Sequence, residues 1–258
     1  MHDAIAVTHE GTVSTVTFSS PPFNLLDVPI MDDLVAAHRE ADAHPQTRVI
    51  VTRSGLEGMF CNGLNPLMVL ESDLAGRVSF FDAVGRMVHG LYSLRKPHIA
   101  VLNGPAMAGG AVLAITADFR YMDRERGAFC FAESKVGVPV PEGLVAVIAA
   151  VCSPAMLREV VLLGKNLTPD LALAAGLVDG LAAAADLDEL VKTQIARLAR
   201  LSPGVLAATK TALRARVLTK TEELAQHSGA DFAQFLGDSY LGEGLKAYLD
   251  GRQPLYTK

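Results

Sequence analysis

The stretch KPHIAVLNGPAMAGGAVLAITADFRY, residues 96–121, decides the fold class of this chain. Residues 98–102 and 119–122 are short runs rich in β-branched and aromatic side chains, which predict two strands. Between them, residues 105–117 are the most apolar window of the sequence and are typical of a helix buried on all sides. A strand, a buried helix and a second strand in this order predict an α/β fold.

Toward the N-terminus, strands and helices continue to alternate. Residues 4–18 predict two strands joined by a turn, and residues 49–52 predict a third strand. Residues 27–44 predict a helix that begins at a capping aspartate. Residues 65–91 predict a single helix, because an Asn-Pro pair begins it and its apolar residues recur at helical spacing.

Toward the C-terminus, the chain is mainly helical from about Gly143. Thr168 and Ser202, each followed by proline, are typical helix starts. We therefore expect a core of strands and helices over residues 1–200 and a helical region over residues 201–258.

Composition restricts the partners and the compartment. The chain has 258 residues and a formal net charge of −5, which gives it little attraction for nucleic acid. No basic start followed by an apolar run is present at the N-terminus, and the most apolar window is too short to span a bilayer. Cys61, Cys130 and Cys152 show no metal-ligand spacing, and the scattered histidines form no metal motif. These features predict a cytoplasmic protein without a membrane span or a metal.

Two turns share one physical design. In FCNGLN (60–65) and NGPAMAGG (103–110), a strand gives way to a helix through glycine. The first N–H groups of a helix lack intrahelical partners and carry the positive end of its dipole. Leu64 N–H and Gly109 N–H are therefore candidates for an oxyanion hole. Each turn taken alone is also compatible with an ordinary strand–helix connection.

Two glutamates are candidate acids or bases. Glu133 follows the apolar residues 128–132, and burial raises the pKa of a carboxyl toward the range useful for proton transfer. The alternative is a strand-end glutamate paired with Lys135 or with solvent. Glu142 is a possible secondary acid, although its position also fits an acid in the first turn of a helix.

Six stretches, in this order and over nearly the whole chain, resemble the crotonase superfamily of enoyl-CoA hydratases and isomerases. They are PPFNLL (21–26), RVIVTRSGLEGMFCNGLN (48–65), KPHIAVLNGPAMAGGAVLAITADFRY (96–121), FAESKVGVPV (131–140), GKNLTPDLALAAGLVD (164–179) and EGLKAYLDGRQPLY (243–256). Each stretch is weak evidence alone, and the ordered set is strong. The resemblance implies a crotonase-like spiral of ββα units with a C-terminal helical region that forms trimers or dimers of trimers.

The resemblance also implies an acyl-CoA substrate whose thioester oxygen lies between Leu64 N–H and Gly109 N–H. Coenzyme A belongs to the substrate, so no separate cofactor is expected. Substrate or coenzyme contacts are implied for Asn24, Leu26, Asn62, Gly63, Asn65 and Pro66. The C-terminal helix, with Lys246, Tyr248 and Arg252, is expected to close the coenzyme site across a subunit contact. Four apolar residues of the C-terminal region support a trimer surface in the sequence: Leu224, Phe232, Phe235 and Leu236.

Departures from the family pattern bear on the reaction. The hydratases use two glutamates, and the positions that match them here hold Val112 and Glu133. Leu64 and the Ala-Gly-Gly at 108–110 resemble delta3-delta2-enoyl-CoA isomerases. One base suffices to move a double bond, whereas hydration is easier with two carboxylates. We therefore expect an isomerase, with a hydratase and a weakly catalytic acyl-CoA-binding protein as alternatives.

Overall fold

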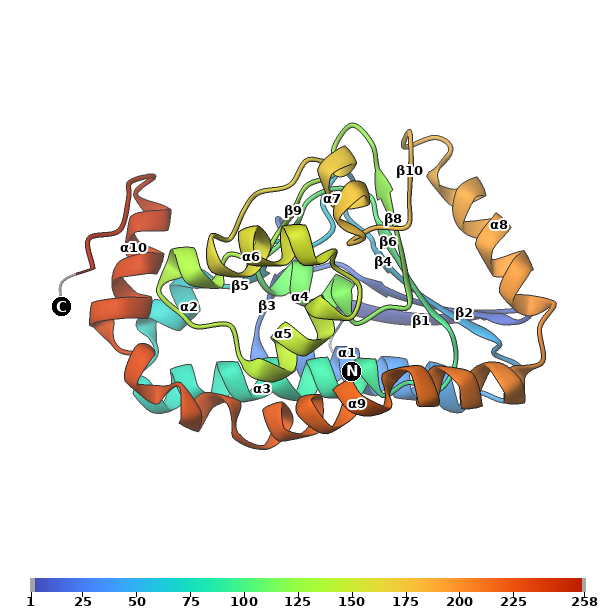
Figure 1. Ribbon diagram of the computed structural model, residues 1–258, viewed down its shortest axis with the longest axis horizontal. Helices are drawn as coiled ribbons and strands as arrows, with labels where there is room; N and C mark the ends of the chain where they lie inside the picture. The colour runs from blue at the N-terminus through green and yellow to red at the C-terminus, as the bar shows by residue number, and fades with distance from the viewer. Residues whose placement is uncertain (1–2, 257–258) are drawn as a thin grey trace.

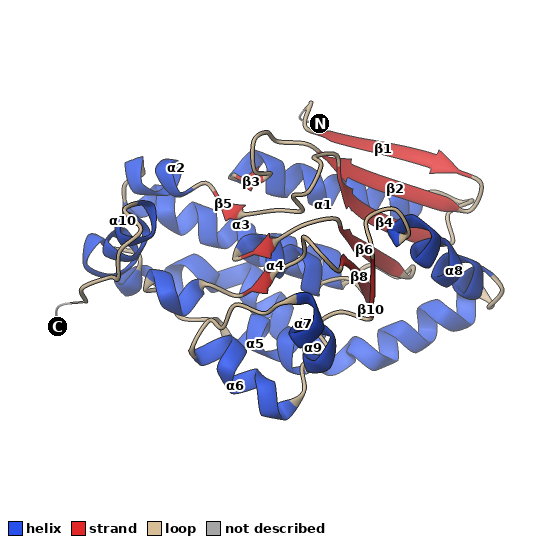
Figure 2. Ribbon diagram, turned by 90° about the horizontal axis from the view of Figure 1, so that it is seen from above, coloured by secondary structure: helices blue, strands red, loops and turns tan. Residues whose placement is uncertain are grey.

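The computed structural model describes residues 3–256 and has the α/β fold that the sequence predicts. Its main sheet has the strand order β1-β2-β4-β6-β8-β10 (Figures 1 and 2). The strands are β1 (Ile5–Glu10), β2 (Val13–Phe18), β4 (Val49–Ser54), β6 (His98–Leu102), β8 (Phe119–Asp123) and β10 (Gly180–Ala182). β1 pairs antiparallel with β2, and the other neighbours are parallel.

Four short strands form two further parallel pairs beside the main sheet. β3 (Leu25–Leu26) pairs with β5 (Gly63–Leu64), and β7 (Ala106–Met107) pairs with β9 (Phe129–Cys130). A parallel bridge between Cys61 and Ala106 joins the two pairs. Successive turns of the chain therefore contribute a main-sheet strand, a short strand and a helix, which is the expected spiral of ββα units.

Helices cover both faces of the main sheet. They are α1 (Val28–Ala43), α2 (Pro66–Glu71), α3 (Leu74–Tyr92), α4 (Gly109–Ile115), α5 (Glu142–Ala149), α6 (Pro154–Leu162), α7 (Pro169–Ala175), α8 (Leu187–Ala199), α9 (Pro203–Asp231) and α10 (Glu243–Leu249). Alternate strand residues divide the core, because Ile50 and Leu102 join the main cluster while Val51 and Val101 pack with α8. On the main-cluster side, α3 lies between α1 and the long α9 (Figure 1).

Two expectations about single elements need correction, and one strand was missed. The helix predicted over residues 65–91 is two helices, because the Asp73 carboxylate accepts from Gly76 N–H and starts α3 afresh. The window 105–117 contributes β7 before α4 begins at Gly109. The strand β10 has only three residues and was not predicted.

The apolar residues that suggested a trimer surface lie largely inside the chain. Leu224 and Leu236 are buried, while Phe232 and Phe235 are half-buried. These four side chains therefore do not form the exposed patch that the sequence suggested, and the trimer remains a prediction. Among the described helices, none is long and apolar enough to cross a membrane.

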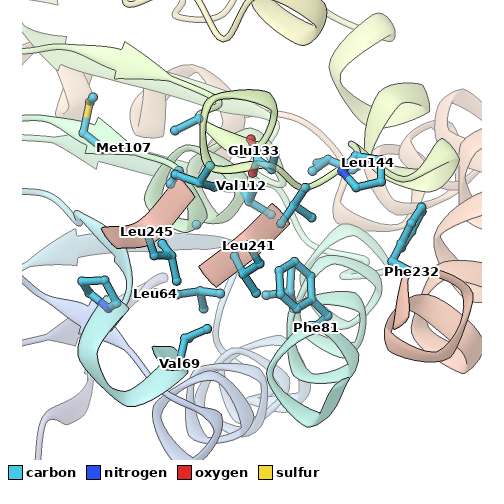
Figure 3. Close-up of a pocket in the computed structure, with 18 of the residues that line it drawn as sticks. Leu64, Val69, Phe81, Met107, Val112, Glu133, Leu144, Phe232, Leu241 and Leu245 are labelled. Carbon is cyan, nitrogen blue, oxygen red and sulfur yellow. The ribbon is translucent and has the colours of Figure 1, made fainter. Parts of the chain in front are cut away.

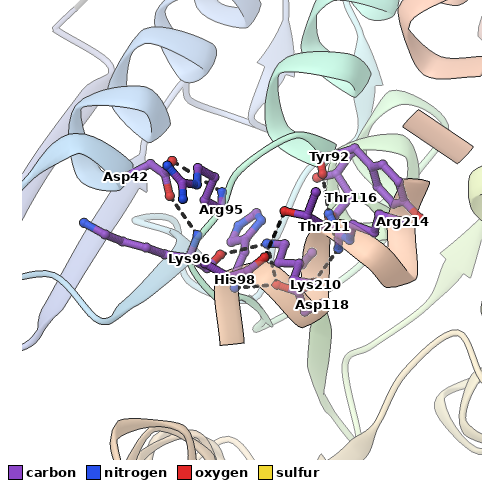
Figure 4. Close-up of polar contacts among 12 residues, drawn as sticks. Asp42, Tyr92, Arg95, Lys96, His98, Thr116, Asp118, Lys210, Thr211 and Arg214 are labelled. Atoms are coloured by element: carbon purple, nitrogen blue, oxygen red, sulfur yellow. Dashed lines mark hydrogen bonds and ion pairs between the residues drawn. The ribbon is translucent and has the colours of Figure 1, made fainter. Parts of the chain in front are cut away.

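A buried charge cluster fastens α9 to the sheet (Figure 4). The Asp118 carboxylate accepts from His98 N–H at 2.8 Å and lies 2.7 Å from both Lys210 Nζ and Arg214 Nη2. The Arg214 guanidinium also donates to the carbonyl oxygen of Tyr92 at 2.7 Å and stacks 3.9 Å from that ring. Two cations from α9 thus share one anion at the edge of the core.

Candidate active site

A cavity of about 160 Å³ lies where the short strands meet α3, α4 and the C-terminal region. Its lining is almost entirely apolar, and Figure 3 shows the labelled side chains around a common space. Asn62, Glu133 and Tyr248 are the polar side chains among the lining residues of the described chain. The cavity therefore suits a hydrocarbon group held near one carboxyl.

The short strands bring three chain segments to this cavity. Met107 N–H donates to the carbonyl oxygen of Cys61 at 2.9 Å, and Ala108 N–H donates to that of Cys130 at 2.8 Å. The strands β5, β7 and β9 therefore end close together. Leu64, Gly109 and Glu133 stand at or just after these strand ends, and all three line the cavity.

The two candidate oxyanion donors lie side by side. A Cβ added at Gly63 would lie 2.8 Å from Gly109 N, and one added at Gly109 would lie 3.4 Å from Leu64 N. Gly109 is the first residue of α4, so its N–H has no partner within the helix. The helix dipole adds positive potential at this point. An oxygen bound here would therefore meet two backbone donors.

The turn before α4 is built for close backbone approach. Ala108 has φ 47°, in the left-handed region that costs a residue with a side chain about 1–3 kcal/mol. A Cβ at Gly110 would lie 2.1 Å from the carbonyl oxygen of Cys61, so only glycine fits there. The strained turn aims the start of α4 at the Gly63–Leu64 segment.

Glu133 begins the short 3-10 helix η1 (Glu133–Val136). Burial raises the pKa of its carboxyl from 4.5 to about 7, and a contact with its own backbone N–H opposes the rise. The Oε2 atom is buried and has no hydrogen-bond partner within residues 3–256. The carboxyl is therefore poised to exchange a proton near neutral pH.

The pairing of Glu133 with Lys135, the alternative that the sequence left open, is not what the structure has. Lys135 Nζ donates to Asn166 Oδ1 at 3.0 Å and lies 3.8 Å from Cys130 Sγ. No salt bridge to Glu133 occurs among the described side chains. The carboxyl instead faces the apolar cavity.

Val112 and Glu142 occupy very different places. Val112, on α4, lines the cavity and is 1% exposed. Glu142 does not line it, because its side chain is 75% exposed and lies 3.3 Å from Lys220 Nζ. Glu142 is thus the acid of a first helical turn, as one of its two sequence interpretations had it.

The residues expected to contact the coenzyme separate into two groups. Asn62 and Pro66 line the cavity, and the buried Gly63 stands behind the two donors. Asn65 caps α2 by accepting from Leu67 N–H and Met68 N–H.

Asn24 and Leu26 support the site from inside the fold. Asn24 is fully buried, and its amide bonds to Ser20 N–H, Ser54 Oγ and the carbonyl oxygen of Phe60. Leu26 is also fully buried, and neither residue lines the cavity. Their side chains support the wall of the site, and their contact with the substrate or the coenzyme remains a prediction.

The C-terminal region closes the cavity of its own chain. Leu241, Leu245 and Tyr248 line the cavity (Figure 3 labels the two leucines), and Asn62 Nδ2 donates to Tyr248 Oη at 3.4 Å. The expectation that this helix closes the coenzyme site across a subunit contact remains a prediction. Sequence reasoning missed Leu241 and Leu245, because nothing local shows which site a distant helix covers.

Other chemistry finds little support at the cavity. Within the described part of the chain, no group of three or more His, Cys, Asp or Glu side chains could hold a metal ion. Burial raises the pKa of the Cys61 thiol to about 12, which disfavours the reactive thiolate. Among the described residues that line the cavity, Glu133 is the one carboxyl.

Comparison with known proteins identifies the family. The model of the family described as enoyl-CoA hydratase/isomerase matches residues 8–258. The chain belongs to this family. Carnitinyl-CoA dehydratase of Salmonella typhimurium is 26% identical, with 99% of each chain covered. The crystal structure of an enoyl-CoA hydratase from Mycobacterium avium subsp. paratuberculosis is 26% identical over 99% of each chain, with a TM-score of 0.85.

Human mitochondrial delta3-delta2-enoyl-CoA isomerase has the same fold as this chain. Its crystal structure superposes with a TM-score of 0.91 at 21% identity, covering 96% of this chain and 98% of the other. The relatives thus include isomerase, hydratase and dehydratase activities on one fold. The family supports an enzyme acting on an acyl-CoA substrate, and the choice of reaction depends on the site.

Proposed function

We propose that this chain isomerises a 3-enoyl-CoA to the 2-enoyl-CoA, with Glu133 as its sole proton shuttle. The observation that carries the proposal is the isolation of this carboxyl. Among the described residues that line the cavity, Glu133 is the only acid, and burial raises its pKa to about 7. One group with this pKa can both take and return a proton near neutral pH.

The reaction then has two steps. The Glu133 carboxylate removes a proton from C2, and the electron pair of that C–H bond moves toward the thioester, whose oxygen becomes negative. Leu64 N–H and Gly109 N–H stabilise this oxygen. The protonated Glu133 next delivers the proton to C4 while the electrons return, so the double bond shifts from C3–C4 to C2–C3.

Hydration fits the same cavity less well. It needs a positioned, activated water together with a proton for C2, and two carboxylates divide that work more easily than one. The resemblance matches Val112, which lines the cavity, to the position of the hydratases' other glutamate, and its apolar side chain cannot hold or activate a water. Hydration of a 2-enoyl-CoA is the second candidate function, because the relatives include a hydratase and a dehydratase.

The lining also favours an uncharged hydrocarbon acyl group. Phe81, Leu144 and Phe232 lie on one side of the cavity (Figure 3), and a charged or hydroxylated chain would find no polar partner beside them. A weakly catalytic acyl-CoA-binding protein, the third possibility from the sequence, would bind such a thioester without turning it over.

Kinetics of Glu133→Gln with a 3-enoyl-CoA test the proposal. Glutamine keeps the shape but cannot act as a carboxylate base, so we expect kcat to fall by roughly 10³-fold or more with KM little changed. Glu142→Gln is the matched control and should keep kcat within about twofold, because its carboxylate is exposed and paired with Lys220. A Glu133→Gln enzyme with most of its isomerase activity would place the base elsewhere. Wild-type binding without turnover would instead favour the third possibility.

A further inference from the structure

The chain beyond α10 folds back as a short strap, residues 250–256, at the end of the molecule that carries α10 (Figure 1). Arg252 donates from Nη1 to Glu243 Oε1 at 2.6 Å and from Nη2 to Glu243 Oε2 at 3.1 Å. Leu255 N–H donates to the same Glu243 Oε1 at 2.7 Å. These three bonds tie both ends of the strap to the first turn of α10.

The strap and α10 both press on η1, the element that carries Glu133. Tyr256 Oη donates to the carbonyl oxygen of Lys135 at 2.9 Å. A Cβ at Gly244 of α10 would lie 2.3 Å from the carbonyl oxygen of Val136, so the two backbones are in direct contact. A Cβ at Gly137 would lie 2.7 Å from the carbonyl oxygen of Tyr240. The outer side of η1 is therefore held by the C-terminal region.

Outside support matters because η1 is short. It spans four residues, and 3-10 hydrogen bonds have poorer geometry than those of an α-helix. Its first residue must keep a carboxyl in an apolar cavity, where unfavourable desolvation pushes the charged form outward. A small outward movement of the η1 backbone would let water reach Glu133.

We propose that Tyr256 is a positioning residue, whose hydrogen bond to the Lys135 carbonyl holds η1 inward and keeps the Glu133 carboxyl aligned with the substrate and away from water. This inference rests on the proposed role of Glu133 as the base. Tyr256 itself does not line the cavity, so it acts only through η1. The site therefore needs the strap to position Glu133, in addition to the residues that contact the acyl group.

Other titratable groups beside Glu133 are few. Cys130 of β9 lies near Glu133. Burial raises the pKa of the Cys130 thiol, and the negative charge of Glu133 raises it further. Lys135 of η1 donates to Asn166, and Tyr248 of α10 lines the cavity. α4 contributes no titratable residue to this wall. A change in the acid limb of the pH profile therefore reports on Glu133.

The test is Tyr256→Phe, which removes one hydroxyl and keeps the ring that stacks on Tyr240. We expect kcat with a 3-enoyl-CoA to fall roughly 3- to 10-fold, with KM changed less than about twofold, since one neutral hydrogen bond is lost. The acid limb of kcat/KM should move to lower pH, because water beside Glu133 would let its pKa return toward 4.5.

Tyr240→Phe is the matched control. Its hydroxyl makes no hydrogen bond to the described residues, so kcat and the pH profile should stay as in the wild type. A Tyr256→Phe enzyme with wild-type kcat and an unmoved acid limb would overturn the inference. So would a raised KM with unchanged kcat, which would make the strap a binding element.

The outcomes separate this inference from the proposed function. If Glu133→Gln abolishes activity and Tyr256→Phe changes nothing, the base stands and the strap inference fails. If Glu133→Gln retains activity, the proposed function fails first, whatever Tyr256 does.

Discussion

The Asp118 cluster and the Glu133 pocket bury acidic groups in opposite ways. Asp118 receives a backbone N–H and two cations from α9, all within 2.8 Å (Figure 4). Glu133 Oε2 meets no hydrogen-bond donor among the described residues, and burial raises the pKa of its carboxyl to about 7. One acid is fully paired and holds a helix in place. The other has its own backbone N–H as a contact and an Oε2 atom without a partner in the described structure, and its raised pKa keeps its proton exchangeable near neutral pH.

The difference shows how one fold separates stability from chemistry. A buried charge is tolerated when its partners are complete, and breaking such a set is costly. A buried acid without partners is unfavourable for folding and useful for proton transfer. The Asp118 cluster and the Glu133 pocket each lead to predictions that could contradict this comparison.

The largest effect is expected in the cluster. Asp118→Ala would leave Lys210 and Arg214 buried without their anion, so the free energy of unfolding should fall by about 3–5 kcal/mol. Chemical denaturation at neutral pH measures this. The control is Asp32→Ala, whose partner Arg86 is 43% exposed, and which should cost less than about 1 kcal/mol. Equal losses of unfolding free energy in the two variants would show that the buried Asp118 cluster contributes no more to stability than the exposed Asp32–Arg86 pair.

A smaller effect is expected at the two candidate oxyanion donors of the pocket, Leu64 N–H and Gly109 N–H. Gly109→Ala would place a methyl group 3.4 Å from Leu64 N and 3.3 Å from Gly63 Cα. These contacts are tight, but small shifts of the neighbouring atoms relieve them, so we expect the variant to fold. The methyl would crowd an oxygen approaching the two N–H groups, so kcat should fall roughly 10- to 100-fold, less than full loss of a donor. Steady-state kinetics with a 3-enoyl-CoA measures it. A variant with unchanged kcat would mean that charge does not develop at this point.

The smallest effect concerns the cost of burying the Glu133 carboxyl without a cationic partner. Burial in the folded protein raises the pKa of the Glu133 carboxyl from 4.5 to about 7. The folded protein therefore binds this proton more tightly than the unfolded chain does. Its stability falls as the pH rises from 4.5 to about 7. Glu133→Gln does not titrate. It should therefore stabilise the protein by roughly 1–3 kcal/mol at about pH 8 and much less at about pH 5.

Denaturation of the wild type and of Glu133→Gln at both pH values tests this. Glu142→Gln, at an exposed position, should show no such pH-dependent gain. A Glu133→Gln protein that is less stable than the wild type at about pH 8 would indicate that the carboxylate has a stabilising partner beyond its own backbone N–H in the folded protein.

Local signals in the sequence predicted much of the fold. The caps at Asp27 and Thr168 each accept a backbone N–H, as their residue types suggested. The boundary between α2 and α3 was missed, because the helical period continues across Ser72 and hides the cap at Asp73. The strand β10 was missed because three residues are too few for an alternating pattern.

The site was predictable where it depends on a turn or an apolar run. Gly109 and Glu133 belong to such segments, and both line the cavity. The substrate contact expected of Asn24 stays a prediction, and its sequence context did not show that its amide binds backbone and hydroxyl groups up to 36 positions away in the sequence. The cover formed by α10 and the strap depends on contacts of still longer range, such as Tyr256 with Lys135. Such contacts leave no periodicity in the sequence.

The measurement that tests the central claim most directly is product analysis with the wild-type enzyme. Equal concentrations of a 3-enoyl-CoA, a 2-enoyl-CoA and a 3-hydroxyacyl-CoA are supplied separately, and the initial rate of each conversion is measured by chromatography. We predict fast conversion of the 3-enoyl-CoA to the 2-enoyl-CoA, with hydration of the 2-enoyl-CoA and dehydration of the 3-hydroxyacyl-CoA slower by at least about tenfold, because one carboxyl beside Val112 cannot easily activate water. A hydration rate equal to or faster than the isomerisation rate would contradict the account.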